Sequence, residues 1–502
     1  MNTLFDPTVH RRQLSRAAAA RAALAIHAAA SPLRQHYHFM PPAGWLNDPN
    51  GCIYYNGMHH LFYQHNPYAP TWAAMHWGHA ASRDMLHWEH LPPALAPSNE
   101  LDDDPRGGCF SGSAVQLPNS TLALIYTAVN GSKANPVTQC AALSKDGTHF
   151  HKLMQNPIVA QLPPNVPCDL RDPKVLRQGK FWYMVLGASL GGSARQGGDG
   201  GALLYRSSDL LNWEFRGVFA QSHGRFGTMW ECPDLFPLGN KWVLTFSPML
   251  CKAAAAVYWV GEMDFEAPRF IPQADGLLDF GGEYYASQSY LAPGGRRIAM
   301  AWQNGWDWMP WWKSFGPTAQ QGWCGCMALP RELYLDAAGC LAVKPITELE
   351  TLRLSPVCAE QTVFGTQEVR LPCPTPSCCE LELCFSLNGG TTRRIMVDLR
   401  IAQGQCTRIV LDLEAEELLF DRSRADGGLC NANRRAPLHT SGGELRLRVF
   451  CDTISVELFI EESRIAMSNL IYPGESFPYI SLHADQGQPQ VRYTCWPLRA
   501  CM

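Results

Sequence analysis

Three carboxylic acids lie in unusual settings along this chain, and together they could cleave a glycosidic bond. Asp48 lies in the run W-L-N-D-P-N-G at 45–51, Asp172 in R-D-P at 171–173, and Glu231 in E-C-P at 231–233. Sugar hydrolysis by paired carboxyl groups needs one group ionised and the other protonated. These motifs therefore make glycoside hydrolysis the first chemistry to consider.

The residues beside each acid fit one of these two states. Arg171 is next to Asp172 and favours its ionised form, whereas the weakly polar Trp230 and Cys232 favour a protonated Glu231. A proline follows each acid within two positions and restricts the backbone there to extended conformations. We therefore expect all three acids at strand ends or strand-to-loop transitions, with Asp48 in a tight loop beside an aromatic ring.

Taken singly, each acid also has a plainer interpretation. Asp48 would cap a turn in a surface loop, Asp172 would form an ordinary ion pair with Arg171, and Glu231 would be a surface residue of a strand. The presence of all three motifs, in order along one chain, favours a catalytic site over these separate interpretations.

Five ordered motifs resemble glycoside hydrolase family 32, the invertases, levanases and related fructosyl-transferring enzymes. They are W-L-N-D-P-N-G at 45–51, Y-Q-H-N-P at 63–67, F-S-G-S at 110–113, R-D-P and E-C-P. The chain is most similar to intracellular bacterial β-fructofuranosidases. The resemblance implies that Asp48 is the nucleophile, Glu231 the general acid/base and Asp172 the transition-state stabiliser. The implied reaction is hydrolysis of sucrose or sucrose 6-phosphate with retention of configuration.

The resemblance also implies a set of substrate-binding residues. These are Trp45, Leu46, Asn47, Gln64, Trp72, Phe110, Ser111, Arg171 and Trp302. At Glu283 the sequence departs from the family pattern, where aspartate is common in a segment that lines the leaving-group side. The alternatives are fructan hydrolysis or fructosyl transfer by the same machinery and, more distantly, an inactive propeller that only binds sugar.

A repeated S-x-D segment predicts the fold that carries these residues. It occurs around Asp84, Asp146 and Asp209 at nearly even spacing, with a degenerate fourth copy around Asp264. Short β-type runs separate the copies, a pattern typical of propeller blades. We expect a five-bladed β-propeller over residues 36–345, the fold that the resemblance also implies.

The rest of the chain divides into a leader, a linker and a second all-β domain. Residues 1–35 are rich in alanine and arginine and predict a leader helix, with a transit peptide as the alternative. Residues 346–355 read as a linker. Alternating segments at 380–387, 393–401, 408–413, 444–450, 454–460 and 479–483 predict a β-sandwich over 356–502, with a role in packing or assembly.

Composition excludes several other function classes. The 502 residues carry a net charge of −4, which gives no electrostatic footprint for nucleic acid or an anionic membrane. The 19 cysteines lack zinc-ribbon spacing, and the pair His36 and His38 has no acid at metal-ligand spacing, so we expect no metal and no cofactor. We interpret most cysteines as buried hydrophobes of a cytoplasmic protein. The expected partner is a small sugar, and a homo-oligomer stays an alternative.

Overall fold

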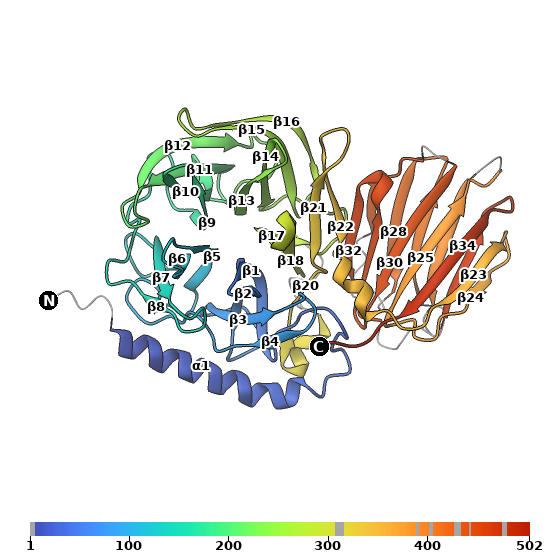
Figure 1. The fold of residues 1–502 in the computed structure, drawn as a ribbon, viewed down its shortest axis with the longest axis horizontal. Helices are drawn as coiled ribbons and strands as arrows, with labels where there is room; N and C mark the ends of the chain where they lie inside the picture. Colours follow the sequence, from blue (N-terminus) through green and yellow to red (C-terminus); the bar gives the residue numbers. More distant parts are fainter. Residues whose placement is uncertain are drawn as a thin grey trace.

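The protein has two β-rich parts beside one long helix. This computed structural model describes residues 6–306, 316–387, 391–400, 405–425, 433–440, 443–473 and 479–502. A ring of sheets is coloured blue to yellow-green in Figure 1, the second part is coloured orange to red beside it, and α1 runs along the outside of the ring. Within these residues, no helix is long and apolar enough to cross a membrane.

The helix α1 (Pro7–Ala28) begins at a capped N-terminus and is attached to the ring. The Asp6 carboxylate accepts a hydrogen bond from the Thr8 amide at 2.8 Å, and Pro7 supplies a preset φ at the first helical position. The Arg21 guanidinium donates to the Leu91 carbonyl at 3.1 Å. Residues 1–5 of the expected leader lie outside the described residues.

Mainly antiparallel sheets make up the ring, and they follow one another in the order of the chain. The first contains β19 (Trp323–Cys324), β1 (Gly44–Tyr55), β2 (Met58–Asn66), β3 (His76–Ser82) and β4 (Trp88–His90), with β19 parallel to β1. The second sheet contains β5 (Gly108–Gln116), β6 (Leu122–Val129), β7 (Val137–Ser144) and β8 (His151–Lys152). The third contains β9 (Leu170–Gln178), β10 (Phe181–Leu190), β11 (Asp199–Ser207) and β12 (Glu214–Gln221).

The next two sheets bring the chain back to its start. The fourth sheet contains β13 (Trp230–Leu238), β14 (Lys241–Pro248), β15 (Val257–Asp264) and β16 (Arg269–Leu277). The fifth contains β17 (Tyr285–Leu291), β18 (Arg297–Gln303), β20 (Cys326–Met327), β21 (Arg331–Leu335) and β22 (Leu341–Pro345). The strands β1, β5, β9, β13 and β17 each contact the next, and β17 contacts β1. They lie innermost around the axis of the ring (Figure 1). The arrangement is that of a β-propeller.

The repeated aspartate of the sequence forms the same turn in four sheets. The carboxylates of Asp84, Asp146, Asp209 and Asp264 each accept hydrogen bonds from the backbone amides two and three residues ahead, at 2.8–3.0 Å. Each turn joins the third strand of its sheet to the fourth. Because the side chain itself closes the turn, the motif is visible in the sequence.

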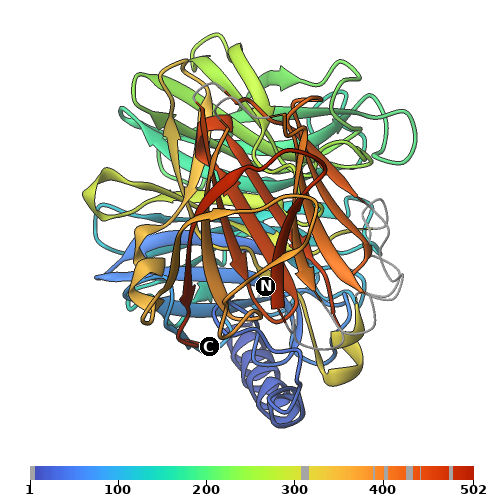
Figure 2. The same cartoon turned by 90° about the vertical axis from the view of Figure 1, so that its right-hand side faces the viewer.

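The second part is a β-sandwich. One sheet contains β23 (Val357–Val363), β34 (Gln490–Pro497), β25 (Cys379–Ser386), β30 (Glu444–Cys451), β31 (Ser455–Ile460) and β32 (Ile465–Leu470). The other contains β24 (Val369–Leu371), β33 (Tyr479–Ala484), β26 (Arg394–Arg400), β27 (Cys406–Asp412), β28 (Glu417–Arg424) and β29 (Arg434–Pro437). Buried aliphatic side chains fill the space between them, and Figure 2 shows this part facing the viewer. Residue 401 of the expected strands lies outside the described residues.

Short 3-10 helices connect strands at several points. They are η1 (Pro293–Gly295), η2 (Pro317–Gln321), η3 (Thr347–Leu352) and η5 (Glu461–Ser463). The helix η3 lies between the last strand of the ring and the first of the sandwich, where the sequence predicts a short linker.

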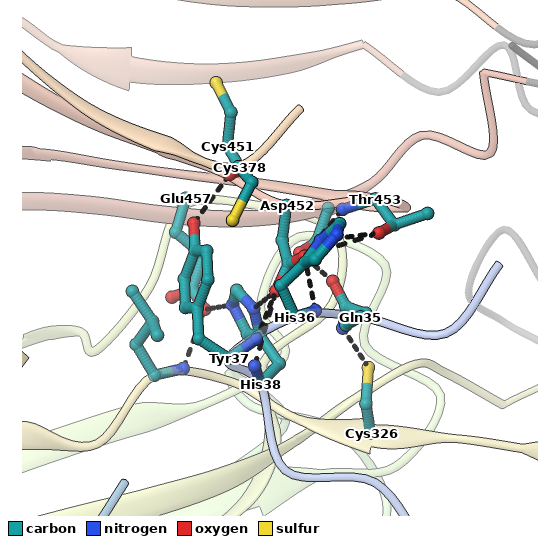
Figure 3. Close-up of polar contacts among 12 residues, drawn as sticks. Gln35, His36, Tyr37, His38, Cys326, Cys378, Cys451, Asp452, Thr453 and Glu457 are labelled. Atoms are coloured by element: carbon teal, nitrogen blue, oxygen red, sulfur yellow. Dashed lines mark hydrogen bonds and ion pairs between the residues drawn. The ribbon is translucent and has the colours of Figure 1, made fainter. Parts of the chain in front are cut away.

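Ion pairs, of which those of His38 are fully buried, join the sandwich to the chain segment that precedes the ring (Figure 3). The two imidazole nitrogens of His38 contact Asp452 at 2.8 Å and Glu457 at 3.1 Å, and His36 contacts Asp452 at 3.0 Å. Burial lowers the pKa of His38, but the two carboxylates outweigh it and raise the pKa to about 9. These histidines therefore form a structural contact between the two parts, made with acids more than 400 residues away in the chain.

Candidate active site

The three acids lie near the beginnings of innermost strands, where the pairing with the neighbouring strand is irregular. Asp48 lies in β1 between the paired residues Leu46 and Pro49, Asp172 in β9, and Glu231 in β13. A β-bulge leaves residues outside the ladder and turns their side chains, and it also accommodates a proline without an N–H. The acids are thus in strands at bulges, and Asp48 is not in the tight loop that its turn-forming neighbours predict.

Backbone conformation marks the same places. Asp172 and Cys232 have φ values of 64° and 47°, which non-glycine residues rarely adopt. Gly187, opposite Arg171 in β10, lies so close to the next sheet that an added Cβ would be 1.9 Å from the Trp230 carbonyl oxygen. Only glycine permits this approach, which holds β9 and β13 side by side and so brings Asp172 near Glu231.

The inner strands converge on a cavity of about 300 Å³ that contains all three acids. Nine of the sequence-predicted site residues line it: Asn47, Asp48, Gln64, Trp72, Phe110, Ser111, Arg171, Asp172 and Glu231. Trp72 and Phe110 meet edge to face, with ring centroids 5.9 Å apart, and form an aromatic wall. A pocket of this size with an aromatic wall and converging carboxylates suits a small polar ligand such as a sugar.

Three of the sequence-predicted binding residues do not line the cavity. The side chains of Trp45, Leu46 and Trp302 are fully buried behind its wall. The Trp45 indole N–H donates to Asn47 Oδ1 at 2.6 Å, and the Trp302 ring lies 4.9 Å from that of Trp306, which does line the cavity. Trp45 and Trp302 therefore support residues of the wall from behind it.

The Asp48 carboxylate is held through one of its two oxygens. Ser111 donates to Asp48 Oδ2 at 2.6 Å, and the Cys232 thiol lies 3.6 Å from the same oxygen. Asp48 Oδ1 has no hydrogen-bond partner among the described residues. Burial and the nearby Glu231 raise the pKa of Asp48 to about 6, against the hydrogen bond from Ser111. The Asp48 carboxylate is therefore oriented by contacts to its Oδ2 atom.

Arg171 pairs with Glu231 and not chiefly with Asp172, contrary to the expectation from their adjacency. Its guanidinium lies 2.8 Å from Glu231 Oε1 and 3.1 Å from Asp169, but 4.0 Å from Asp172. Burial raises the pKa of Asp172 to about 7, and Glu231 and Asp48 add to this against the effect of Arg171. The backbone amide of Cys232 donates to Asp172 Oδ2 at 2.9 Å. Arg171 thus favours the ionised form of Asp172, as its adjacency predicts, but burial and the two neighbouring acids outweigh this effect.

The side chains that surround Glu231 are also not the ones that its neighbours in the sequence predict. Trp230 points away and stacks on Phe246, with ring centroids 3.7 Å apart. Glu231 instead receives the Tyr285 hydroxyl on Oε2 at 2.6 Å and Arg171 on Oε1. Two donors from two different sheets thus fix the orientation of this carboxyl group.

Sequence reasoning missed four residues at this site. Tyr285 contacts Glu231, and Arg195, Met249 and Trp306 line the cavity. Arg195 comes from a glycine-rich segment that carries no recognisable ligand motif, and the Trp306 in A-W-Q-N-G-W was overlooked beside Trp302. Glu283, expected on the leaving-group side, is fully buried and pairs with Arg422 of the sandwich at 2.8 Å.

Comparison with known proteins identifies the class of this chain. Residues 38–345 match the glycosyl hydrolases family 32 N-terminal domain, and residues 348–497 match the family's C-terminal domain. The chain belongs to glycosyl hydrolase family 32.

Its relatives include enzymes named for different substrates. It is 38% identical to the sucrose-6-phosphate hydrolase of Escherichia coli over 90% of this chain and 92% of that one. It is 33% identical to the levanase of Bacillus subtilis over 93% of this chain and 70% of that one. The solved sucrose-6-phosphate hydrolase of Lactobacillus gasseri superposes with a TM-score of 0.82 at 27% identity, covering 97% of each chain.

Proposed function

We propose that this protein is a β-fructofuranosidase that hydrolyses sucrose or sucrose 6-phosphate. The observation that carries the proposal is the cavity in which Asp48, Asp172 and Glu231 meet. Relatives named sucrose-6-phosphate hydrolase support the substrate class. We further propose that the ring is a five-bladed propeller over residues 36–345, followed by a linker at 346–355 and a sandwich domain over 356–502.

The proposed mechanism is double displacement, with a role for each of the three acids that line the cavity. Asp48 attacks the anomeric C2 of the fructosyl unit, and Ser111 orients its carboxylate. Glu231 protonates the departing glycosidic oxygen, so the C2–O bond breaks as the Asp48–C2 bond forms. Water then attacks C2 with Glu231 as the base, which releases Asp48 and retains the configuration. Asp172 binds fructosyl hydroxyls and stabilises the positive charge that develops in both transition states.

Steady-state kinetics on sucrose and sucrose 6-phosphate, measured side by side, test the proposal. NMR of the first-formed product adds the stereochemistry, and we expect β-fructofuranose to be released first. Release of the α-anomer would mean that Asp48 acts as a base toward water. Lack of turnover of both substrates would leave fructan hydrolysis and the inactive sugar-binding propeller as the alternatives.

Fructan hydrolysis is the second candidate, favoured by the similarity to a levanase. The same acids would act on a terminal fructosyl unit, with the rest of the chain beyond the cavity mouth. Assays on levan and inulin separate the two, since a sucrose-specific enzyme would turn these polymers over at least tenfold more slowly. Kinetics with added sugar acceptors would reveal fructosyl transfer.

We also propose a cytoplasmic location. Cysteines such as Cys52, Cys109 and Cys140 are buried thiols without a disulfide partner, as a reducing compartment allows. Fractionation of the producing cells, with activity assayed in each fraction, would test this.

A further inference from the structure

Three cysteine sulfur atoms lie together in the sandwich, far in sequence from the acids of the cavity. Cys373 Sγ is 3.2 Å from Cys495 Sγ and 3.6 Å from Cys379 Sγ, and the three sulfurs are within 4.8 Å of one another. Among the described residues, this is the one group of three or more histidine, cysteine, aspartate or glutamate side chains with the spacing to hold a metal ion. We call these residues the thiol triad.

The sheet register places two members of the triad side by side. In the pairing of β25 with β34, Leu381 is opposite Cys495, so Cys379 lies two residues along on the same face. Both cysteines belong to the apolar interior of the sandwich, with 0% of their surface exposed. Their positions are therefore fixed by strand pairing and by core packing.

The third member arrives from the segment between β24 and β25, which is held in place independently. The Tyr493 hydroxyl of β34 donates to the Pro372 carbonyl at 2.8 Å, one residue before Cys373. The prolines Pro374 and Pro376 restrict the backbone that follows. Cys373 is partly exposed and provides a route from solvent to the two buried sulfurs.

The distances between the three sulfurs suit a metal ion that binds thiolate ligands. Zinc–sulfur bonds of about 2.3 Å in a tetrahedral site place the sulfurs about 3.8 Å apart. The two sulfur–sulfur distances from Cys373, 3.2 and 3.6 Å, are slightly shorter than this value, and all three sulfurs lie within 4.8 Å of one another. Small side-chain rotations would therefore bring the three sulfurs to the spacing of a zinc site. A disulfide needs about 2.05 Å between two sulfurs and would leave the third thiol unused, whereas a metal engages all three.

We infer that Cys373, Cys379 and Cys495 bind one thiophilic d10 metal ion, Zn²⁺ or Cu⁺, at a structural site that joins the segment before β25 to β34. Binding replaces three S–H bonds by three metal–sulfur bonds and releases the three protons to solvent, with no change of oxidation state. With Zn²⁺, the three thiolates leave a net charge of −1, and the partly exposed side admits water as a fourth ligand. With Cu⁺, three-coordinate thiolate ligation needs no fourth ligand.

The test uses the full-length protein, purified under reductant, stripped with a chelator and then exposed to each metal separately. We expect one equivalent of Zn²⁺ or, anaerobically, of Cu⁺, and a higher unfolding temperature with the metal that binds. The variants Cys373→Ser and Cys495→Ser should lose the bound equivalent. Cys384→Ser is the matched control, because Cys384 lies on β25 with its side chain on the opposite face, and it should keep the metal.

A measurement on the unmutated protein guards against variants that fail to fold. Alkylation of each cysteine by iodoacetamide, followed by mass spectrometry, should slow at least tenfold at the triad when the metal is added. Unchanged alkylation, absence of bound metal, or full retention of the metal by Cys373→Ser would overturn the assignment. A Cys373–Cys495 disulfide in protein that binds no metal after reduction would overturn it as well.

Discussion

Ser111 of one sheet donates a 2.6 Å hydrogen bond to the Asp48 carboxylate of the neighbouring sheet. This bond stabilises the ionised form of Asp48, the proposed nucleophile, against the burial that raises its pKa to about 6. Ser111 thus lowers the pH at which the Asp48 carboxyl group ionises.

Ser111→Ala should move the acidic limb of activity to higher pH. Asp48 must be ionised to attack, so activity rises with pH through its pKa. Loss of the donor raises that pKa further, by about one unit if the hydrogen bond contributes ~1.4 kcal/mol. Profiles of kcat/KM against pH would show the shift, with Ser132→Ala on an exposed turn as the control. An unmoved limb would show that Ser111 does not tune Asp48.

Asp48→Ala and Glu231→Ala should each abolish most of the turnover. In the proposed mechanism Asp48 is the nucleophile and Glu231 the acid, and loss of such a group costs on the order of 10³-fold or more. Turnover of sucrose should be compared with thermal unfolding, which should stay near that of the unmutated protein. Retention of more than about a tenth of the activity by either pure variant would refute its assigned role.

Arg195→Ala should distinguish the two substrates. Arg195 is exposed at the cavity wall, and a guanidinium there can bind a phosphate through charge-assisted hydrogen bonds. We expect KM for sucrose 6-phosphate to rise about tenfold, with little change for sucrose. Arg269→Ala, an exposed arginine on β16, is the control. Equal effects on both sugars would show that Arg195 does not recognise the phosphate.

His38→Gln should lose stability in a pH-dependent manner. The pKa of His38 is raised to about 9, so its ion pairs contribute fully below about pH 6.5 and are lost as the pH rises through 9. Burial raises the pKa of Glu457, but His38 and Arg331 outweigh it and lower it to about 2. The same pair therefore also weakens as the pH falls from about 4 toward 2.

Thermal unfolding of the unmutated protein and of His38→Gln would check this dependence. The difference in unfolding temperature should be several degrees at pH 6.5 and should shrink at pH 9.5, where neutral His38 no longer pairs with Asp452 and Glu457. A difference that is the same at both pH values would mean that the contribution of His38 is packing and not charge.

What the sequence predicted depended on how local each signal is. The aspartate turns were visible because Asp84 and its repeats bond amides only two and three residues ahead. The acids were visible through their motifs, and Asn47, Gln64, Trp72 and Phe110 through the family resemblance. The sequence did not reveal the side chains that orient these acids. Tyr285 reaches Glu231 from another sheet, and Arg171 turns from Asp172 to Glu231 at a bulge, a feature that the order of residues does not reveal.

The parallel pairing of β19 with β1 has a consequence for biosynthesis. Gly44 and Trp45 pair with Trp323 and Cys324, so the strand that carries Asp48 is incomplete until the ribosome has made the last part of the ring. Until then, the edge of β1 has unpaired backbone groups, and the chain must close this long-range contact after most of the other strands of the ring exist. A messenger truncated before codon 323 would therefore yield an open-edged intermediate that is prone to aggregate, and complete translation is a condition for a working site.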